Sequence, residues 1–385
     1  MVSTTAVMET QFAEQFKDFL KGEAAPALRQ LRENAFASFT RLGFPTPKAE
    51  DWKYTDVRPI AKTPWSVFPT AILPDGACAS NLDRLKDFSS ERNGFTALNM
   101  AFAQFLVVVI PKDMSFSEPI TLDLEARNGA MFCPHILVIA EAGSKATIVE
   151  SYASTANSFT NSAIQVVVED NACVTHYRVQ KDAPEAFNVG TTEVSLGRGS
   201  RYDSTNINLG SALSRHDIDL KFTAEGGEAF VDGLYMLNGT QHHDTHSIID
   251  HTVPNCISHQ TYKGVLNDTS RGVFNGKVFV RENAHGTDAQ QSNKNLLLSD
   301  TARVDTKPQL EIFNDDVKCS HGATVGQLEE EELFYLLTRG LPETLAKNLL
   351  TYGFAEAIIR KVGIESIKAD LDAAVLNRLS VKLEV

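Results

Sequence analysis

The chain has 385 residues and a formal net charge of −13, and 43% of its residues are hydrophobic. This hydrophobic content is typical of a folded globular protein and excludes a disordered chain, while the length allows two domains or one large β domain with appendages. The strong negative charge argues against nucleic acid and anionic membrane surfaces as partners.

The first hundred or so residues are expected to form helices followed by an irregular segment. Apolar residues recur at helical spacing over residues 8–42. Prolines interspersed with tryptophans indicate an irregular linker over residues 50–76, and residues 81–104 are ambiguous but fit a helix and a loop. We therefore predict an N-terminal helical region and linker over residues 1–104.

The spacing of the apolar residues changes near Phe105. Short apolar runs rich in β-branched residues follow one another from there, and no convincing helical pattern interrupts them for about two hundred residues. An α/β sheet needs helices between its strands, so that class is excluded. We predict an all-β core over residues 105–324.

A faint internal repeat runs through this core. Gly143, Asn171, Gly199 and Gly226 each precede a small residue and then a strand, at spacings of 28, 28 and 27 residues. A fixed period of this length in an all-strand region indicates a solenoid with one coil per repeat. A right-handed parallel β-helix fits the pattern, although four repeats alone leave open a β-sandwich with evenly spaced turns.

Residues 325–385 are predicted to form a C-terminal helical module. Four glutamates at 329–332 begin a helix, where the helix dipole favours negative charge, and apolar residues follow them. Two further amphipathic segments lie at 344–359 and 364–379. So small a module cannot bury all of its apolar surface alone. It must therefore pack on the β core, on a partner, or on both.

Two residues near the end of the β core have metal-binding side chains. Cys319 and His321 are two positions apart in a predicted strand, so their side chains leave the same face. Thiolate and neutral imidazole are ligands that suit iron and zinc. Two ligands do not make a complete metal site, and a buried cysteine beside a hydrogen-bonded histidine is the alternative interpretation.

A second group of histidines lies between residues 242 and 251. In an extended strand His242 and His246 share one face with Asp244, whereas His243 and His251 point to the other face. This division favours a polar ladder along stacked coils over a zinc site, but a zinc-binding protein remains an alternative function.

The cysteines and the absence of export signals predict a cytoplasmic protein. The five cysteines are scattered without CxxC spacing, which is typical of a reducing compartment. Neither a secretory signal nor a stretch of about 20 apolar residues is recognisable in the sequence. The cysteines are Cys78, Cys133, Cys173, Cys256 and Cys319.

Several longer motifs carry a family resemblance. They are GVFNGK at 272–277, QQSNKNLLLSD at 290–300, DTKP at 305–308, DDVKCSHGAT at 315–324 and EDWKYT at 50–55. With these nearly continuous motifs the sequence resembles the SufB/SufD family of iron–sulfur cluster assembly proteins. EDWKYT and the modest length make it most similar to the SufD branch.

The resemblance implies a non-catalytic scaffold with a β-helix core. It implies a heterodimer with SufB through the β-helix cores, docking of the SufC ATPase on the C-terminal helices, and a homodimer when the chain is alone. A transient iron–sulfur cluster would form at the SufB interface with His321 as a candidate ligand and Cys319 as a second matching residue. The isolated chain is expected to hold no cofactor. The family associates a reduced flavin with the assembled complex, but no motif in this sequence indicates a flavin site.

A competing function from another class is a β-helix enzyme that acts on polysaccharide. Such enzymes are typically exported and carry clustered carboxylates on one strand face. The lack of a recognisable secretory signal and the helical C-terminal segment argue against this alternative.

Overall fold

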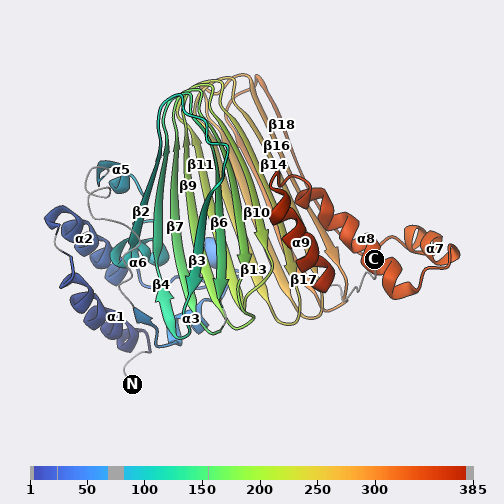
Figure 1. The fold of residues 1–385 in the computed structure, drawn as a ribbon, viewed down its shortest axis with the longest axis horizontal. Coiled ribbons are helices and arrows are strands. Elements are labelled where there is room, and N and C mark those ends of the chain that lie inside the picture. The colour runs from blue at the N-terminus through green and yellow to red at the C-terminus, as the bar shows by residue number, and fades with distance from the viewer. Residues whose placement is uncertain (1–3, 24, 68–81, 155, 379–385) are drawn as a thin grey trace.

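A computed structural model describes residues 4–23, 25–67, 82–154 and 156–378. It shows a long stack of parallel strands with helices at its N-terminal end and further helices against one side (Figure 1). Cys78 and the part of the predicted linker beyond residue 67 lie outside the described residues. No helix in the described part of the chain is long and apolar enough to cross a membrane.

The N-terminal module is built around aromatic side chains. Phe12, Phe16 and Phe19 of the first helix surround Phe102, with ring centroids 5.4–6.2 Å apart. Residues 81–104, for which the sequence was ambiguous, contain two helices. The second is capped by Asn93 and is buried along its whole length. The elements are α1 (Thr4–Leu20), α2 (Pro26–Leu42), η1 (Glu50–Trp52), α3 (Arg58–Lys62), β1 (Ser66–Val67), α5 (Leu82–Lys86) and α6 (Gly94–Phe102).

The core is a solenoid made of two parallel sheets. From β5 onward successive strands alternate between the sheets, so that each pair of strands forms one coil. Sheet A contains β1, β2 (Gln104–Ile110), β4 (Ala130–Phe132), β5 (Pro134–Ala140), β7 (Phe159–Val168), β9 (Phe187–Leu196), β11 (Leu213–Phe222), β13 (His242–His251), β15 (Arg271–Val280) and β17 (Arg303–Ile312). Sheet B contains β3 (Ile120–Ala126), β6 (Lys145–Ser154), β8 (Cys173–Lys181), β10 (Arg201–Asn208), β12 (Glu228–Leu237), β14 (Ile257–Leu266), β16 (Thr287–Leu297) and β18 (Val317–Gly326).

One corner of the solenoid explains the sequence repeat. Gly143, Asn171, Gly199 and Gly226 all have positive φ, between 57° and 77°. Glycine and asparagine tolerate this left-handed conformation better than other residues do. The backbone N–H of Gly143 donates to Asp170 in the next coil at 2.9 Å, and the same bond recurs down the column. The prediction of a parallel β-helix flanked by helices is confirmed, and the β-sandwich alternative is wrong.

The N-terminal module is fastened to sheet A by the EDWKYT motif. The ring of Trp52 lies 3.7 Å from the guanidinium carbon of Arg215, which is 2% exposed. Arg215 forms ion pairs of 2.8 Å with both Asp217 and Asp244. Thr55 donates a hydrogen bond to Asp244. The buried guanidinium therefore lies between two buried carboxylates beneath the tryptophan, and Arg92 and His246 make further contacts with Asp217 and Asp244.

We predict that Arg215→Met lowers the free energy of unfolding by about 3–5 kcal/mol, because it removes the buried cation that contacts both carboxylates most closely. Chemical denaturation measures this value. The control is Arg198→Met, which breaks an exposed ion pair with Glu225 and is expected to change stability by less than about 1 kcal/mol. Equal effects of the two substitutions would contradict the prediction.

The C-terminal helices divide into a docked pair and a projecting helix. Helices α8 (Glu343–Ile359) and α9 (Glu365–Arg378) pack on the outer face of sheet B, where Ile359 and Leu371 are fully buried. Lys361 forms a 2.7 Å ion pair with Asp232 of β12. Helix α7 (Glu330–Thr338) instead extends away from the solenoid (Figure 1) and buries none of its residues.

Candidate functional site

The last coil of the solenoid, β17 and β18, has open edges. Among the described residues β17 pairs only with β15, and β18 pairs only with β16. Large apolar side chains lie exposed beside these edges: Ile312 is 41%, Phe313 55% and Val325 49% exposed. Unpaired strand edges bordered by apolar side chains are a surface on which another chain can add.

Both sequence-predicted ligands are on β18 in this coil. Cys319 is half-buried and packs against the solenoid core, whereas His321 is exposed. Their partners in the register of β16 are Ala289 and Gln291, both of which are buried. The two side chains therefore leave the inner face of the strand, with His321 toward the part of the solenoid that is open at its end.

The environment of Cys319 favours the protonated thiol. Burial raises its pKa, and the nearby negative charge of Asp288 acts in the same direction. A hydrogen bond involving the backbone of Ala289 opposes them. Since a cysteine binds metal as the thiolate, coordination here would have to displace a proton.

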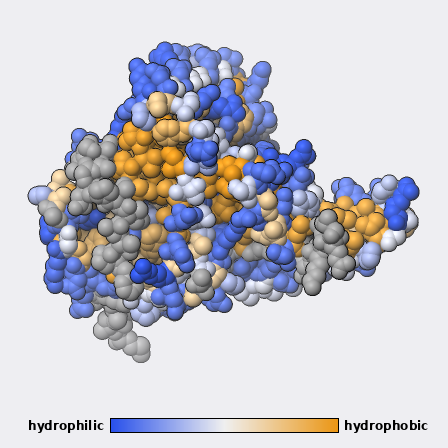
Figure 2. Space-filling model, viewed as in Figure 1, coloured by the Kyte–Doolittle hydropathy of each residue, from blue (hydrophilic) through white to orange (hydrophobic). Residues whose placement is uncertain are grey.

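A second exposed apolar surface lies on α7. Phe334 is 68%, Tyr335 57% and Leu337 38% exposed, and Figure 2 shows hydrophobic surface on this projecting part of the molecule. A shallow hollow of about 420 Å³ borders it, lined by Glu331, Glu332, Tyr335, Leu336 and Leu350. We refer to these exposed side chains and the hollow as the α7 surface. A short helix with this composition and no buried residue is suited to a protein partner.

The histidines in the segment 242–251 lie on opposite faces of β13, as the two-residue period of a strand predicts. His242 donates its Nε2–H to the hydroxyl of Thr55 at 2.9 Å on the outer face, because the Thr55 hydroxyl itself donates to Asp244. His243 lies inside, between Ser214 and Thr245, where burial lowers its pKa to about 3. No group of three potential ligands placed to hold a metal occurs within the described ranges. These contacts are those of a polar ladder.

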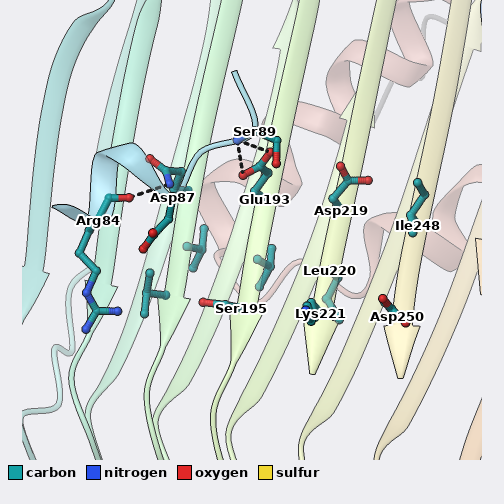
Figure 3. A pocket seen from close by; sticks show the side chains of 14 residues that line it. Arg84, Asp87, Ser89, Glu193, Ser195, Asp219, Leu220, Lys221, Ile248 and Asp250 are labelled. Atoms are coloured by element: carbon teal, nitrogen blue, oxygen red, sulfur yellow. Dashed lines mark hydrogen bonds between the residues drawn. The ribbon is translucent and has the colours of Figure 1, made fainter. Parts of the chain in front are cut away.

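Sequence reasoning missed a groove on the outer face of sheet A. It has a volume of about 420 Å³ and lies between the segment that follows α5 and strands β7 to β13 (Figure 3). Glu193 accepts the backbone N–H of Ser89, Arg92 pairs with Asp219, and Arg281 pairs with Asp250. The carboxylates come from neighbouring strands about 30 residues apart in sequence, so no local motif could reveal them.

Burial raises the pKa values of the two central carboxyl groups. The pKa of Glu193 rises to about 7 and that of Asp219 to about 6, in each case mainly because burial disfavours the charged form. The charge of Asp219 also acts on Glu193, which is its directly paired neighbour. Hydrogen bonds from Ser89 and the charge of Arg92 partly offset these effects.

These shifts predict a pH dependence of stability. The carboxyl groups of Glu193 and Asp219 stay protonated to a higher pH in the folded state than in the unfolded chain. Their contribution to the free energy of unfolding is therefore complete below about pH 4.5, and it is lost as pH rises through about 7. Glu193→Gln should remove on the order of 1–2 kcal/mol of this pH-dependent fall in the free energy of unfolding, a value that allows for the partial exposure of the Glu193 side chain. Urea denaturation between pH 5 and 8 tests this, with the exposed Glu185→Gln as control. Parallel curves for wild type and Glu193→Gln would contradict it.

The clustered carboxylates also bear on the polysaccharide-enzyme alternative. Asp219 and Asp250 are bound to arginines and Glu193 to a backbone amide. A general acid and base need side chains that are free to exchange protons with a substrate. Glu193 and Asp219 instead fasten the 84–93 segment to the solenoid, and Asp250 is held by Arg281, so the clustering of these carboxylates does not favour glycoside hydrolysis.

Fold and site together describe a β-solenoid whose last coil has open strand edges among the described residues. Residues 123–354 match the family described as SUF system FeS cluster assembly, SufBD core domain, and residues 7–71 match the SufBD protein N-terminal region. The chain belongs to the SufBD family of iron–sulfur cluster assembly proteins.

Named relatives agree with this assignment. An iron–sulfur cluster assembly SufBD family protein of Synechocystis is 37% identical over 298 residues, which cover 74% of this chain and 66% of that protein. The iron–sulfur cluster assembly protein SufD of Escherichia coli is 30% identical over 383 residues, covering 88% and 90% of the two chains. The protein of the same name from Bacillus subtilis is 28% identical over 299 residues, covering 75% and 68%.

Proposed function

We propose that this chain is the SufD-like scaffold subunit of a cytoplasmic SufB–SufC–SufD complex that builds iron–sulfur clusters de novo. In this proposal the chain itself is not a catalyst, and the energy comes from ATP hydrolysis by SufC. The open last coil carries the proposal, because it places Cys319 and His321 beside unpaired strand edges and exposed apolar side chains.

Ligand counting supports a shared site. An iron–sulfur cluster usually takes four protein ligands. Cys319 and His321 supply at most two, so the others must come from a second chain seated on the open coil. That chain is SufB in the proposed complex. When the chain is alone, a second copy of it occupies the open coil without a cluster. The cluster is then a product in transit, and no resident cofactor is proposed for the isolated chain. A reduced flavin remains an expectation from family resemblance only.

The α7 surface is the proposed docking site for SufC. It is apolar and exposed, and it projects from a module whose other two helices are fixed on sheet B. Movement of an ATPase bound there would be transmitted through α8 and α9 to sheet B, which includes β18. Domain motions of this kind can open or close an interface between subunits.

Co-expression with SufB and SufC of the same organism tests the proposal. Anaerobic affinity purification through a tag on this chain should recover all three proteins, with iron and acid-labile sulfide on the complex. Recovery of this chain alone, or of a complex that never carries iron and sulfide, would refute the proposed function.

A further inference from the structure

A chain of buried amide groups lies directly beneath the candidate ligand His321. The side-chain Nε2 of Gln291 donates to Oε1 of Gln260 at 2.7 Å. Gln260 in turn donates through its Nε2 to the hydroxyl of Ser247 at 2.9 Å. All three side chains are at most 3% exposed. The hydrogen bonds connect strands β16, β14 and β13 across the interior of the solenoid.

This chain of hydrogen bonds leaves one acceptor unused. The Oε1 atom of Gln291 is buried and has no hydrogen-bond partner among the described residues. Because the Nε2 of the same amide is held by Gln260, the carbonyl end cannot turn toward that partner. A buried carbonyl oxygen without a donor is unfavourable by about 1–3 kcal/mol, and such groups are uncommon in folded proteins.

The register places the backbone of His321 beside that of Gln291, while the exposed imidazole is not hydrogen-bonded to Oε1 in the structure. Gln291 of β16 is paired directly with His321 of β18, and adjacent strands lie about 4.8 Å apart. Both side chains leave the inner face, because the residues two positions earlier, Ala289 and Cys319, contact the solenoid core. On the opposite sheet Gly276 leaves room for the amide, since a Cβ atom at Gly276 would overlap Gln291.

We propose that Gln291 is a positioning residue for His321. When the exposed His321 side chain rotates toward β16, the Oε1 of Gln291 can accept the N–H of one imidazole nitrogen and thereby fix the tautomer and the ring plane. The second ring nitrogen then carries the lone pair and points out of the open coil toward the incoming iron. The inference rests on the ligand role proposed above for His321 and goes beyond it by naming the group that prepares the ligand.

Such a partner has a recognised effect on metal binding. Histidines that bind metals usually donate their other N–H to a carbonyl or carboxylate, which orients the ring and raises its basicity. Loss of the partner typically weakens metal affinity by about 10–100-fold. The GVFNGK and QQSNKNLLLSD motifs supply Gly276 and Gln291, so the inference gives both motifs a common purpose.

The first test is NMR spectroscopy of the full chain labelled at histidine with ¹⁵N, using His321→Ala to assign the His321 signals. In the wild type we expect one dominant tautomer of His321 with a slowly exchanging ring N–H. Gln291→Leu removes the acceptor at similar volume and should lose that N–H signal. Gln291→Glu keeps an acceptor oxygen and should retain it. Ser247→Ala, at the far end of the hydrogen-bonded chain, should leave the signal unchanged.

The second test measures iron binding in the complex with SufB and SufC. Gln291→Leu should weaken iron retention during dialysis against a chelator by about 10–100-fold, and Gln291→Glu should restore most of it. A wild-type His321 whose ring N–H exchanges as in a free histidine would overturn the inference without any variant. A normal iron content in His321→Ala would instead refute the ligand role, and the positioning role would fall with it.

Discussion

Replacing His321 with alanine is expected to abolish most cluster formation while leaving the complex assembled. The substitution removes an imidazole from an exposed site on an edge strand and leaves the backbone pairing of β18 with β16 in place. Binding to SufB and SufC and hydrolysis of ATP should therefore persist. Iron and acid-labile sulfide on the purified complex should fall to a small fraction of the wild-type content, because the shared site loses a ligand that no neighbour replaces.

His285→Ala is a matched control for this experiment. His285 is also exposed and lies in a corner of the solenoid only one coil away, so the control removes the same ring from the same chain. It should leave the iron content unchanged. Cys319→Ser should have a smaller effect than His321→Ala, since burial keeps its thiol protonated until a metal arrives. Normal iron and sulfide in His321→Ala would show that His321 is not a ligand.

The corners of the solenoid could be predicted because they depend on backbone conformation. A left-handed turn admits few residue types, so Gly143, Asn171 and Gly199 mark it in the sequence. The inner face of each coil accepts more residue types than these turns do. Strand β16 reads TDAQQSNKNLL, with little apolar alternation, and was not recognisable as a strand by hydrophobicity alone. Its inward-facing Asn293 is fully buried and bonded to other polar groups.

The candidate site was likewise predictable only in the features that depend on the local strand. The two-residue period of a strand places Cys319 and His321 on one face, and both residues lie on strand β18, as predicted. The open edge, the position of Gln291 beneath His321 and the groove at Glu193 all depend on which strands pair and in what register. These pairings join residues about 30 positions apart, where no local sequence signal specifies them.

A double substitution on α7, Phe334→Asp with Tyr335→Ala, is expected to abolish binding of SufC. Both side chains are more than half exposed, and α7 has no buried residue, so the fold should remain intact. Aromatic residues that are hot spots of a protein interface contribute about 2 kcal/mol or more each, so affinity should fall by roughly 100-fold or more if Phe334 and Tyr335 anchor the contact. The measurement is the affinity of the purified chain for SufC, for example by calorimetry.

Substitution is a sharper test than deletion of residues 325–385. Helices α8 and α9 cover Val179, Ile207 and Leu234 on the outer face of sheet B, and their removal would expose that face and confuse lost docking with lost stability. Leu42→Asp, at an exposed apolar residue of the N-terminal module, is the matched control and should bind SufC normally. Unchanged affinity of the α7 variant would place the SufC contact elsewhere. Loss of SufC binding with unchanged SufB binding would show that the α7 surface and the open coil bind separate partners.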